Sequence, residues 1–316
     1  MARRRNQSKK FIRYIVSAVC VILICITFYN ADTNLSLEEN LSRVFSGQSG
    51  TAAADFKPDN TGKFMLYAID TGNSDSQLCI APDGRSMLVD AADEEDFAVI
   101  KSALDKYGVK KIDVLIATHP HADHIGSMDE VIEKVGAEKI YMTDFPEDSE
   151  VYDNLEDAIK TCGIQSEYAV SGMQFSLGDA SVKVLSPLNK QYEDANNASI
   201  VLLVSYGQSD FLLTGDMEED ASKDLIEDWG KALDCEVLKV AHHGSRTGAS
   251  EEFLKAATPD VAVITCGEGN SYGHPHKETL DLLSMFHVQT LRTDLNGDIA
   301  ILTDGTNIEA YTQISQ

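Results

Sequence analysis

The stretch Thr118-His119-Pro120-His121-Ala122-Asp123-His124-Ile125-Gly126 places three histidines and one aspartate within six residues. It directly follows an apolar run at 112–117, which is typical of a buried strand. Imidazole and carboxylate are the usual ligands of zinc, manganese and iron. We expect His119 and His121 to bind one ion, and Asp123 and His124, which lie past the bend, to bind a second. The stretch therefore predicts a metal centre at a strand end.

Further motifs rich in aspartate and histidine follow in a fixed order. They are Leu213-Thr214-Gly215-Asp216, Lys239-Val240-Ala241-His242-His243-Gly244-Ser245, Asn270-Ser271-Tyr272-Gly273-His274-Pro275-His276, and Thr293-Asp294 with Gly297-Asp298. With the first motif, which reads H-x-H-x-D-H, this set resembles the metallo-β-lactamase superfamily. Within it, the set is similar to the hydrolase domain of ComEC-type competence proteins over residues 63–314. The resemblance implies an α/β (α+β) fold, a four-layer αββα sandwich with metals where the strand ends of both halves meet.

The resemblance also implies which later residues hold metal. Asp216 would bridge the two ions, although on sequence alone it could instead cap the helix that follows. His274 fits the place of the late histidine ligand, and His242 is the alternative. Whether His243 is this ligand instead is left open. If the strand continues through the two adjacent histidines, they point in opposite directions and differ in role. Zinc is the expected ion, in one or two copies, with manganese as the alternative.

One departure from the superfamily pattern concerns the first ion. No histidine lies between His124 and His242, whereas many members supply a third imidazole from this interval. The segment Asn196-Asn197-Ala198-Ser199 offers neutral oxygens at best, so one site is expected to be weak, water-completed or empty. The alternative is that these asparagines only form a turn before the next strand. Both interpretations stay open at this stage.

Other roles follow from the motifs. We expect Asp123, His243 and His276 to take part in catalysis, with a histidine protonating the leaving oxygen. Asp75 and Asp90 are expected to hold histidine N–H groups and so fix the tautomer. The loop Asp70-Thr71-Gly72-Asn73-Ser74-Asp75-Ser76 resembles the first loop of the family but differs at two positions. The expected substrate contacts are Asn197, Ser245, Asn270 and Tyr272.

The expected activity is hydrolysis by a metal-bound hydroxide, with phosphodiesters as the leading substrate. The substrate is then a small or polymeric phosphoester, with DNA and envelope phosphoesters as candidates. The alternative is a non-enzymatic, degenerate metal-binding member of the fold, which the missing third histidine favours. Charge also bears on the substrate. Outside residues 1–13 the chain carries 20 basic and 51 acidic side chains, and such a surface repels phosphate backbones.

The N-terminus predicts a membrane anchor. Six basic residues lie within the tail at 1–13 and precede an apolar stretch at 14–29, a pattern that favours a cytoplasmic N-terminus. The bulky Tyr29 disfavours signal cleavage, so we expect a single-pass anchor with the catalytic domain outside the cytoplasm; secretion after cleavage is the alternative. Residues 30–62 are typical of a linker, and 63–316 form the predicted hydrolase domain. No protein partner is inferred.

The remaining chain alternates strand and helix signals. Strands are expected at 64–69, 77–80, 86–90, 112–117, 181–185, 200–206, 211–214, 235–240, 261–266, 288–292, 299–302 and 308–311. Helices are expected at 94–106, 127–135, 151–161, 218–228, 250–256 and 277–285. Several strands are apolar on both faces and must be covered on both sides, which favours sheets between helical layers.

Overall fold

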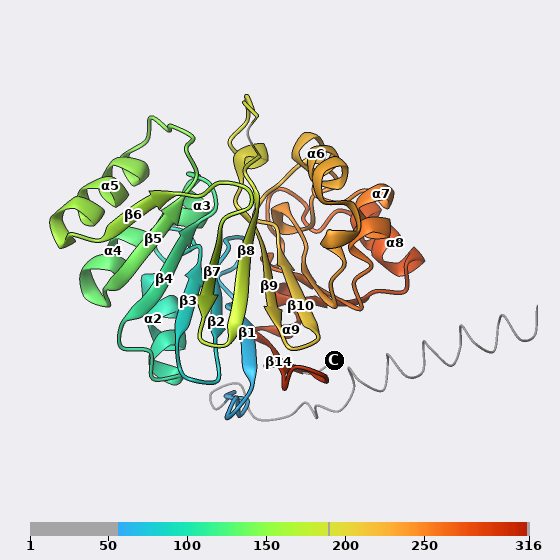
Figure 1. Ribbon diagram of the computed structural model, residues 1–316, viewed down its shortest axis with the longest axis horizontal. Helices are drawn as coiled ribbons and strands as arrows, with labels where there is room; N and C mark the ends of the chain where they lie inside the picture. Colours follow the sequence, from blue (N-terminus) through green and yellow to red (C-terminus); the bar gives the residue numbers. More distant parts are fainter. Residues whose placement is uncertain (1–55, 189, 315–316) are drawn as a thin grey trace, which may run out of the picture. The chain divides into compact units, whose positions relative to one another are not determined.

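The computed structural model describes residues 56–188 and 190–314 (Figure 1). The predicted basic tail, the anchor at 14–29 and most of the linker at 30–62 lie outside the described residues. Within the part described, no helix is both long enough and apolar enough to cross a membrane.

Two sheets form the frame of the fold. In spatial order, the first sheet contains β15 (Ile308–Thr312), β14 (Ile299–Thr303), β1 (Phe64–Ala68), β2 (Gln77–Ile80), β3 (Ser86–Val89), β4 (Ile112–Ala117), β5 (Ala137–Met142) and β6 (Gln165–Tyr168). The second contains β13 (Gln289–Arg292), β12 (Val261–Ile264), β11 (Val237–Lys239), β10 (Ser209–Leu213), β9 (Val201–Tyr206), β8 (Ala180–Ser186) and β7 (Gln174–Leu177). The predicted α/β sandwich with two sheets is confirmed.

Helices cover the outer face of each sheet (Figure 1). The first sheet packs against α2 (Phe97–Lys106), α4 (Met128–Lys134) and α5 (Glu150–Cys162), and the second against α6 (Glu219–Trp229), α7 (Glu251–Ala257) and α8 (Lys277–Met285). The shorter helices are α3 (Ala122–Ile125), α9 (Thr293–Asn296), η2 (Asn196–Ala198), η3 (Gly230–Leu233) and η4 (His242–Gly244). The inner faces of the sheets meet through aromatic contacts such as Phe64 with Phe211, whose ring centroids lie 5.2 Å apart.

Helix ends follow local sequence signals. Ser149 caps α5 by accepting a hydrogen bond from Tyr152 N, and Ser250 caps α7 by accepting one from Phe253 N. Gly163 ends α5 in a left-handed conformation that glycine adopts without strain. The six predicted helices are therefore present with shifts of a few residues at their ends, and the predicted strand at 235–240 is shorter, covering only Val237–Lys239.

Three strands were not predicted. β5 mixes apolar and charged residues, and all four residues of β6 are exposed, so neither gives a clear alternation of apolar and polar positions. β7 is exposed or half-buried except at Leu177. These strands lie toward the sheet edges, where pairing with a neighbour rather than burial defines the strand.

Parallel pairing places the predicted motifs at neighbouring strand ends. In the first sheet β3, β4 and β5 run parallel, and in the second β10, β11 and β12 run parallel. Asp90 follows β3, and the first histidine motif follows β4; Asp216 and His242 follow β10 and β11 in the other sheet. The carboxyl ends of parallel strands share one edge, so each sheet brings its motifs together there.

Gly126 holds the end of α3 close to a neighbouring loop. A Cβ atom at this position would lie 2.4 Å from Glu94 N and 2.5 Å from the carbonyl carbon of Asp93. Since both atoms belong to backbone, the loop or the helix must move to make room. We expect Gly126→Ala to lower the free energy of unfolding by about 1–3 kcal/mol, measured by denaturant unfolding. An unchanged unfolding midpoint would contradict this packing.

Candidate metal centre

His119 and His121 follow the end of β4 and face one another. His119 is fully buried, and its Nε2 lies 3.1 Å from His121 Nδ1. The other ring nitrogen of His119, Nδ1, lies 3.1 Å from Thr118 Oγ1, and that hydroxyl donates to Asp90 Oδ2 at 2.7 Å. With its proton committed to Asp90, the Thr118 oxygen accepts from His119 Nδ1–H. The neutral ring therefore turns the lone pair of Nε2 toward His121.

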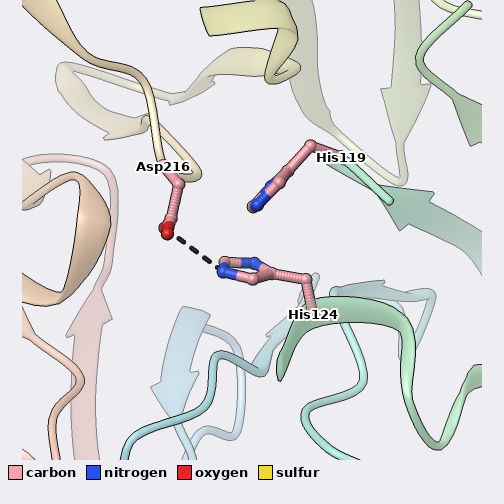
Figure 2. Close-up of side chains that lie close together, drawn as sticks. All are labelled: His119, His124 and Asp216. Atoms are coloured by element: carbon pink, nitrogen blue, oxygen red, sulfur yellow. Dashed lines mark ion pairs between the residues drawn. The ribbon is translucent and has the colours of Figure 1, made fainter. Parts of the chain in front are cut away.

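His124 has the same arrangement. Its Nδ1 donates to Asp90 Oδ2 at 2.7 Å, and both side chains are fully buried. Its Nε2 lies 3.2 Å from Asp216 Oδ1. Figure 2 shows His119, His124 and Asp216 pointing toward one another from three different segments. Asp90 thus fixes the orientation of His124 directly and that of His119 through Thr118, which is the positioning expected of a carboxylate behind metal ligands.

Asp123 and His243 complete the group. His243 Nε2 lies 3.3 Å from Asp123 Oδ2 and 3.6 Å from Asp216 Oδ2. The Nδ1 of His243 donates to the carbonyl oxygen of Thr265 at 3.0 Å. This third histidine therefore also presents Nε2 to the carboxylates. Asp216 does not cap α6, since the residue at that cap is Glu218.

The electrostatics of the group are strongly coupled. Burial alone would lower the pKa of His124, but Asp216, Asp90 and Asp123 together hold that pKa well above its usual value. Burial would raise the pKa of Asp216, yet His124 and His243 keep it well below its usual range. Burial and the neighbouring His124 lower the pKa of His119. Burial likewise opposes ionisation of Asp123, but His124 and His243 lower its pKa, whereas burial raises the pKa of Asp90. Asp216 and Asp123 are therefore the ionised carboxylates that face the histidine nitrogens.

The residues present fit a divalent metal ion. His124 Nε2, Asp216 Oδ1 and His243 Nε2 are buried and make no well-aligned hydrogen bond within the described part of the chain. Leaving such atoms unpaired costs free energy unless another partner is bound. Ligand atoms lie within 4.8 Å of one another in three sets: His119 with His124 and Asp216, Asp123 with His124 and His243, and Asp75 with Asp90 and His124. The third set is already paired internally, since Asp90 accepts from His124 Nδ1 and Asp75 faces Lys239. Nitrogen and carboxylate donors in this number suit zinc or a similar ion.

The comparisons with known proteins agree with this geometry. The family model described as "Metallo-beta-lactamase superfamily" matches residues 71–149 and 174–268, more than half of the chain. The chain belongs to the metallo-β-lactamase superfamily. Membership places it among metal-dependent hydrolases in general and confirms the predicted resemblance.

Curated relatives narrow the comparison to competence proteins. The chain is 30% identical to ComE operon protein 3 of Bacillus subtilis over 252 residues, covering 73% of this chain and 32% of that protein. It is 30% identical to Competence protein ComA of Neisseria gonorrhoeae over 198 residues, covering 63% of this chain and 26% of that protein. The chain thus spans about a third or less of the length of these relatives.

A solved structure shows the same fold. The metallo-β-lactamase fold protein YhfI from Bacillus subtilis aligns with a TM-score of 0.50 at 14% identity, over 72% of this chain and 96% of that chain. The likeness extends to the fold alone.

The loop after β11 adopts an unusual backbone. His242 and His243 have φ of 51° and 52°, and Gly244 has φ of 80°. Left-handed backbone at two adjacent residues other than glycine costs on the order of 1–3 kcal/mol each and is concentrated at functional sites. The condition under which the two histidines would point in opposite directions, a strand that continues through them, is not met, because β11 ends at Lys239. Both Nε2 atoms instead approach Asp216 Oδ2, from 3.8 Å for His242 and 3.6 Å for His243.

The structure distinguishes the candidates for the late histidine ligand. His243 shares a potential ligand set with Asp123 and His124, whereas neither His242 nor His274 belongs to one among the described residues. His242 Nδ1 donates to Glu218 Oε1 at 2.9 Å. Burial and the nearby His242 lower the pKa of His274 to about 4. The geometry thus favours His243 in the place for which His274 was expected.

His276 lies beside His274, with their ring centroids 4.8 Å apart. Its Nδ1 accepts a hydrogen bond from Arg246 N at 3.0 Å. Because that nitrogen is an acceptor, the neutral ring carries its proton on Nε2. His276 therefore offers an Nε2–H that can donate a hydrogen bond.

Residues expected to contact substrate make hydrogen bonds within the scaffold. Asn197 Oδ1 accepts from Ala221 N at 3.0 Å, and Ser245 Oγ lies 2.9 Å from Thr247 Oγ1. Asn270 accepts from His274 N at 3.0 Å and so braces its own loop. Tyr272 is 67% exposed and stacks on His274. Contact with substrate stays a prediction for all four, and Tyr272 is the most accessible of them.

The two asparagines before β9 differ in their hydrogen bonding. Asn197 supports the first turn of α6, which is the turn-forming interpretation. The Oδ1 of Asn196 is buried without a hydrogen-bond partner in the described residues. An oxygen from Asn196 therefore remains available to a ligand.

Asp75 differs from its expected role. It was expected to hold a histidine N–H, but its side chain contacts Lys239, Thr265 and Gln77. The reason is that Lys239 is fully buried and its ammonium requires a carboxylate.

Sequence reasoning also missed Thr118, Thr265 and Glu218 as the groups that orient histidines; only Thr118, inside the first motif, carried a signal.

Metal binding by this group is expected to release protons. Without a metal ion, Asp216, Asp90 and Asp123 outweigh burial and raise the pKa of His124, which favours its protonated ring. The pKa of His243 is also raised, since Asp216 and Asp123 outweigh burial. A cation must displace these protons, so its affinity falls as the pH is lowered through the histidine range. Calorimetric zinc titrations in buffers of different ionisation enthalpy measure the release; heats independent of the buffer would contradict it.

Proposed function

We propose that this chain is a metal-dependent phosphodiesterase. The observation that carries the proposal is the convergence of buried donor atoms from both sheets that make no well-aligned hydrogen bond within the described residues, above all His124 Nε2, Asp216 Oδ1 and His243 Nε2. Two adjacent sets of donors suit a pair of ions, and paired ions are the usual means of hydrolysing phosphoesters.

The chain's own residues would act as metal ligands, as groups that orient those ligands, and as a donor to the leaving oxygen. The ligands would be His119, His121, Asp123, His124, Asp216 and His243. Bound ions would supply Lewis-acid chemistry and a more acidic water at neutral pH. Asp90 and the Thr265 carbonyl would hold the histidine rings in the tautomer that presents Nε2. His276, whose neutral ring carries hydrogen on Nε2, is the hydrogen-bond donor that we assign to the leaving oxygen, which then takes its proton from water.

The substrate class rests on charge and on the relatives. Competence-protein relatives favour a phosphodiester, and DNA is one candidate. However, the chain carries a formal net charge of −25, which disfavours a long polyanion. A small phosphodiester or an envelope phosphoester is therefore the preferred substrate.

A chromogenic phosphodiester tests the activity. Purified protein is expected to hydrolyse bis-(p-nitrophenyl) phosphate, to lose this turnover on chelation, and to regain it with zinc or manganese. A panel of DNA, nucleotides, choline phosphoesters, lactones and β-lactams would then define the substrate. Bound metal without turnover on any member of the panel would favour the alternative, a non-enzymatic metal-binding protein.

We also propose that residues 14–29 tether the catalytic domain outside the cytoplasm. The support is the sequence pattern of basic residues before an apolar stretch. A flexible linker of this length would span on the order of 30 Å. Protease added to intact, wall-stripped cells is expected to digest the domain, while the undigested protein fractionates with membranes. Full protection of the domain would contradict the orientation, and a mature form in the medium lacking the first 31 residues would show cleavage.

A further inference from the structure

A buried ion pair joins the two sheets next to the metal donors. Lys239 Nζ lies 2.9 Å from Asp75 Oδ2, and each side chain is only 1% exposed. Lys239 is the last residue of β11 in the second sheet, and Asp75 lies between β1 and β2 of the first. Removing two charges from water is costly, and apolar residues of similar volume often stabilise a protein as well or better. Stability alone therefore does not account for the pair.

The donors form two halves, one from the first histidine motif on the first sheet and one from Asp216 and His243 on the second. Asp75 is connected to the first half. Its backbone N donates to the carbonyl oxygen of Asp123 at 2.9 Å. Its own carbonyl accepts from Ala92 N at 2.9 Å. Asp75 thus fixes the backbone of one expected ligand.

The same residue is connected to the other half through its side chain. Thr265 Oγ1 donates to Asp75 Oδ1 at 2.6 Å, and the carbonyl of Thr265 accepts the Nδ1 proton of His243 at 3.0 Å. A displacement of Asp75 would therefore move the group that orients His243.

Lys239 contacts the remaining segments of that half. Its ammonium donates to the carbonyl of Val240 at 3.1 Å, just before the strained histidine pair. Its own carbonyl accepts from Thr214 Oγ1 at 2.6 Å, two residues before Asp216. The pair therefore touches the segments that carry Asp123, His243 and Asp216.

We propose that the Lys239–Asp75 pair is a positioning device that sets the separation between the two halves of the metal centre. It holds Asp123 on one side against His243 and Asp216 on the other. Neither member of the pair is proposed as a ligand. The inference rests on the proposed metal centre. In that centre the ion pair keeps the metal ligands in position, and ligands must be held to a fraction of an ångström.

The test removes both charges together. Lys239→Met/Asp75→Asn keeps the side-chain volumes and leaves no buried charge unpaired. We expect the full-length double variant to fold and to bind zinc about tenfold or more weakly than the wild type, measured by competition with a chromophoric chelator. The visible absorption of bound Co²⁺ is expected to change, because the ligands around it are displaced. Lys63→Met/Glu309→Gln, which removes the pair between Lys63, just before β1, and Glu309 in β15, is the control and is expected to bind zinc as the wild type does.

Thr265→Val provides a second test that keeps the ion pair. It removes only the hydroxyl between Asp75 and the loop that orients His243, and we expect weaker zinc binding with an unchanged fold. Wild-type zinc affinity and Co²⁺ absorption in a folded double variant would overturn the inference; if the double variant does not fold, wild-type affinity in Thr265→Val would do so. A wild-type protein that binds no metal would instead overturn the proposed metal centre and, with it, this inference.

Discussion

Replacing Asp216 with asparagine is expected to lower kcat for phosphodiester hydrolysis by about 10³-fold while the protein stays folded. The carboxylate is 2% exposed, and its two oxygens lie 3.2 Å from His124 Nε2 and 3.6 Å from His243 Nε2. An amide lacks the negative charge and turns a donor group toward the cation. Asp216 follows the end of β10 rather than packing in the apolar core, so the fold should survive.

The measurement combines steady-state kinetics, metal content and thermal unfolding. Asp220→Asn is a suitable control, because Asp220 is an exposed aspartate in the first turn of α6. It is expected to keep wild-type kcat and metal content. A folded Asp216→Asn variant with wild-type turnover would rule out a metal-ligand role for this carboxylate.

Replacing His243 with alanine is expected to weaken zinc binding about 10²-fold or more and to abolish most turnover. His243 Nε2 lies 3.3 Å from Asp123 Oδ2, and its Nδ1 donates its proton to the Thr265 carbonyl. Nε2 is therefore the ring atom that faces the expected metal position. Competition titrations with a chromophoric chelator measure the change in zinc affinity.

His274→Ala distinguishes the two candidate histidines. His274 lies next to the centre, with its ring centroid 6.2 Å from that of His243, but belongs to no potential ligand set of the described residues. This variant is expected to retain zinc affinity. Loss of zinc in His274→Ala together with retention in His243→Ala would restore the assignment made from the sequence.

Much of the site could be predicted because its residues are close in the chain. His119, His121, Asp123 and His124 follow one buried strand, and their spacing alone indicates a metal centre. The sandwich could also be predicted, since strands apolar on both faces require cover on both sides. Exposed strands such as β6 carry no such pattern and were missed.

The groups that orient the ligands could not be predicted, because they are distant in sequence. Asp75 meets Lys239 and Thr265 only after the two sheets pack together. The direction of His243 likewise depends on left-handed backbone at two residues, which neither side chain favours intrinsically. Sequence patterns report burial and spacing, and they do not report backbone strain that the surrounding structure imposes.

Metal content is the most direct test of the central claim, which is that these converging donors hold divalent ions. Elemental analysis of the purified, folded protein, after dialysis against zinc or manganese and removal of the excess, measures ions per chain. The two overlapping donor sets that contain Asp216 and His243 predict one to two ions per chain, lost on chelation and reduced in the Asp216→Asn and His243→Ala variants. A folded wild-type protein that retains no divalent ion under these conditions would contradict the account.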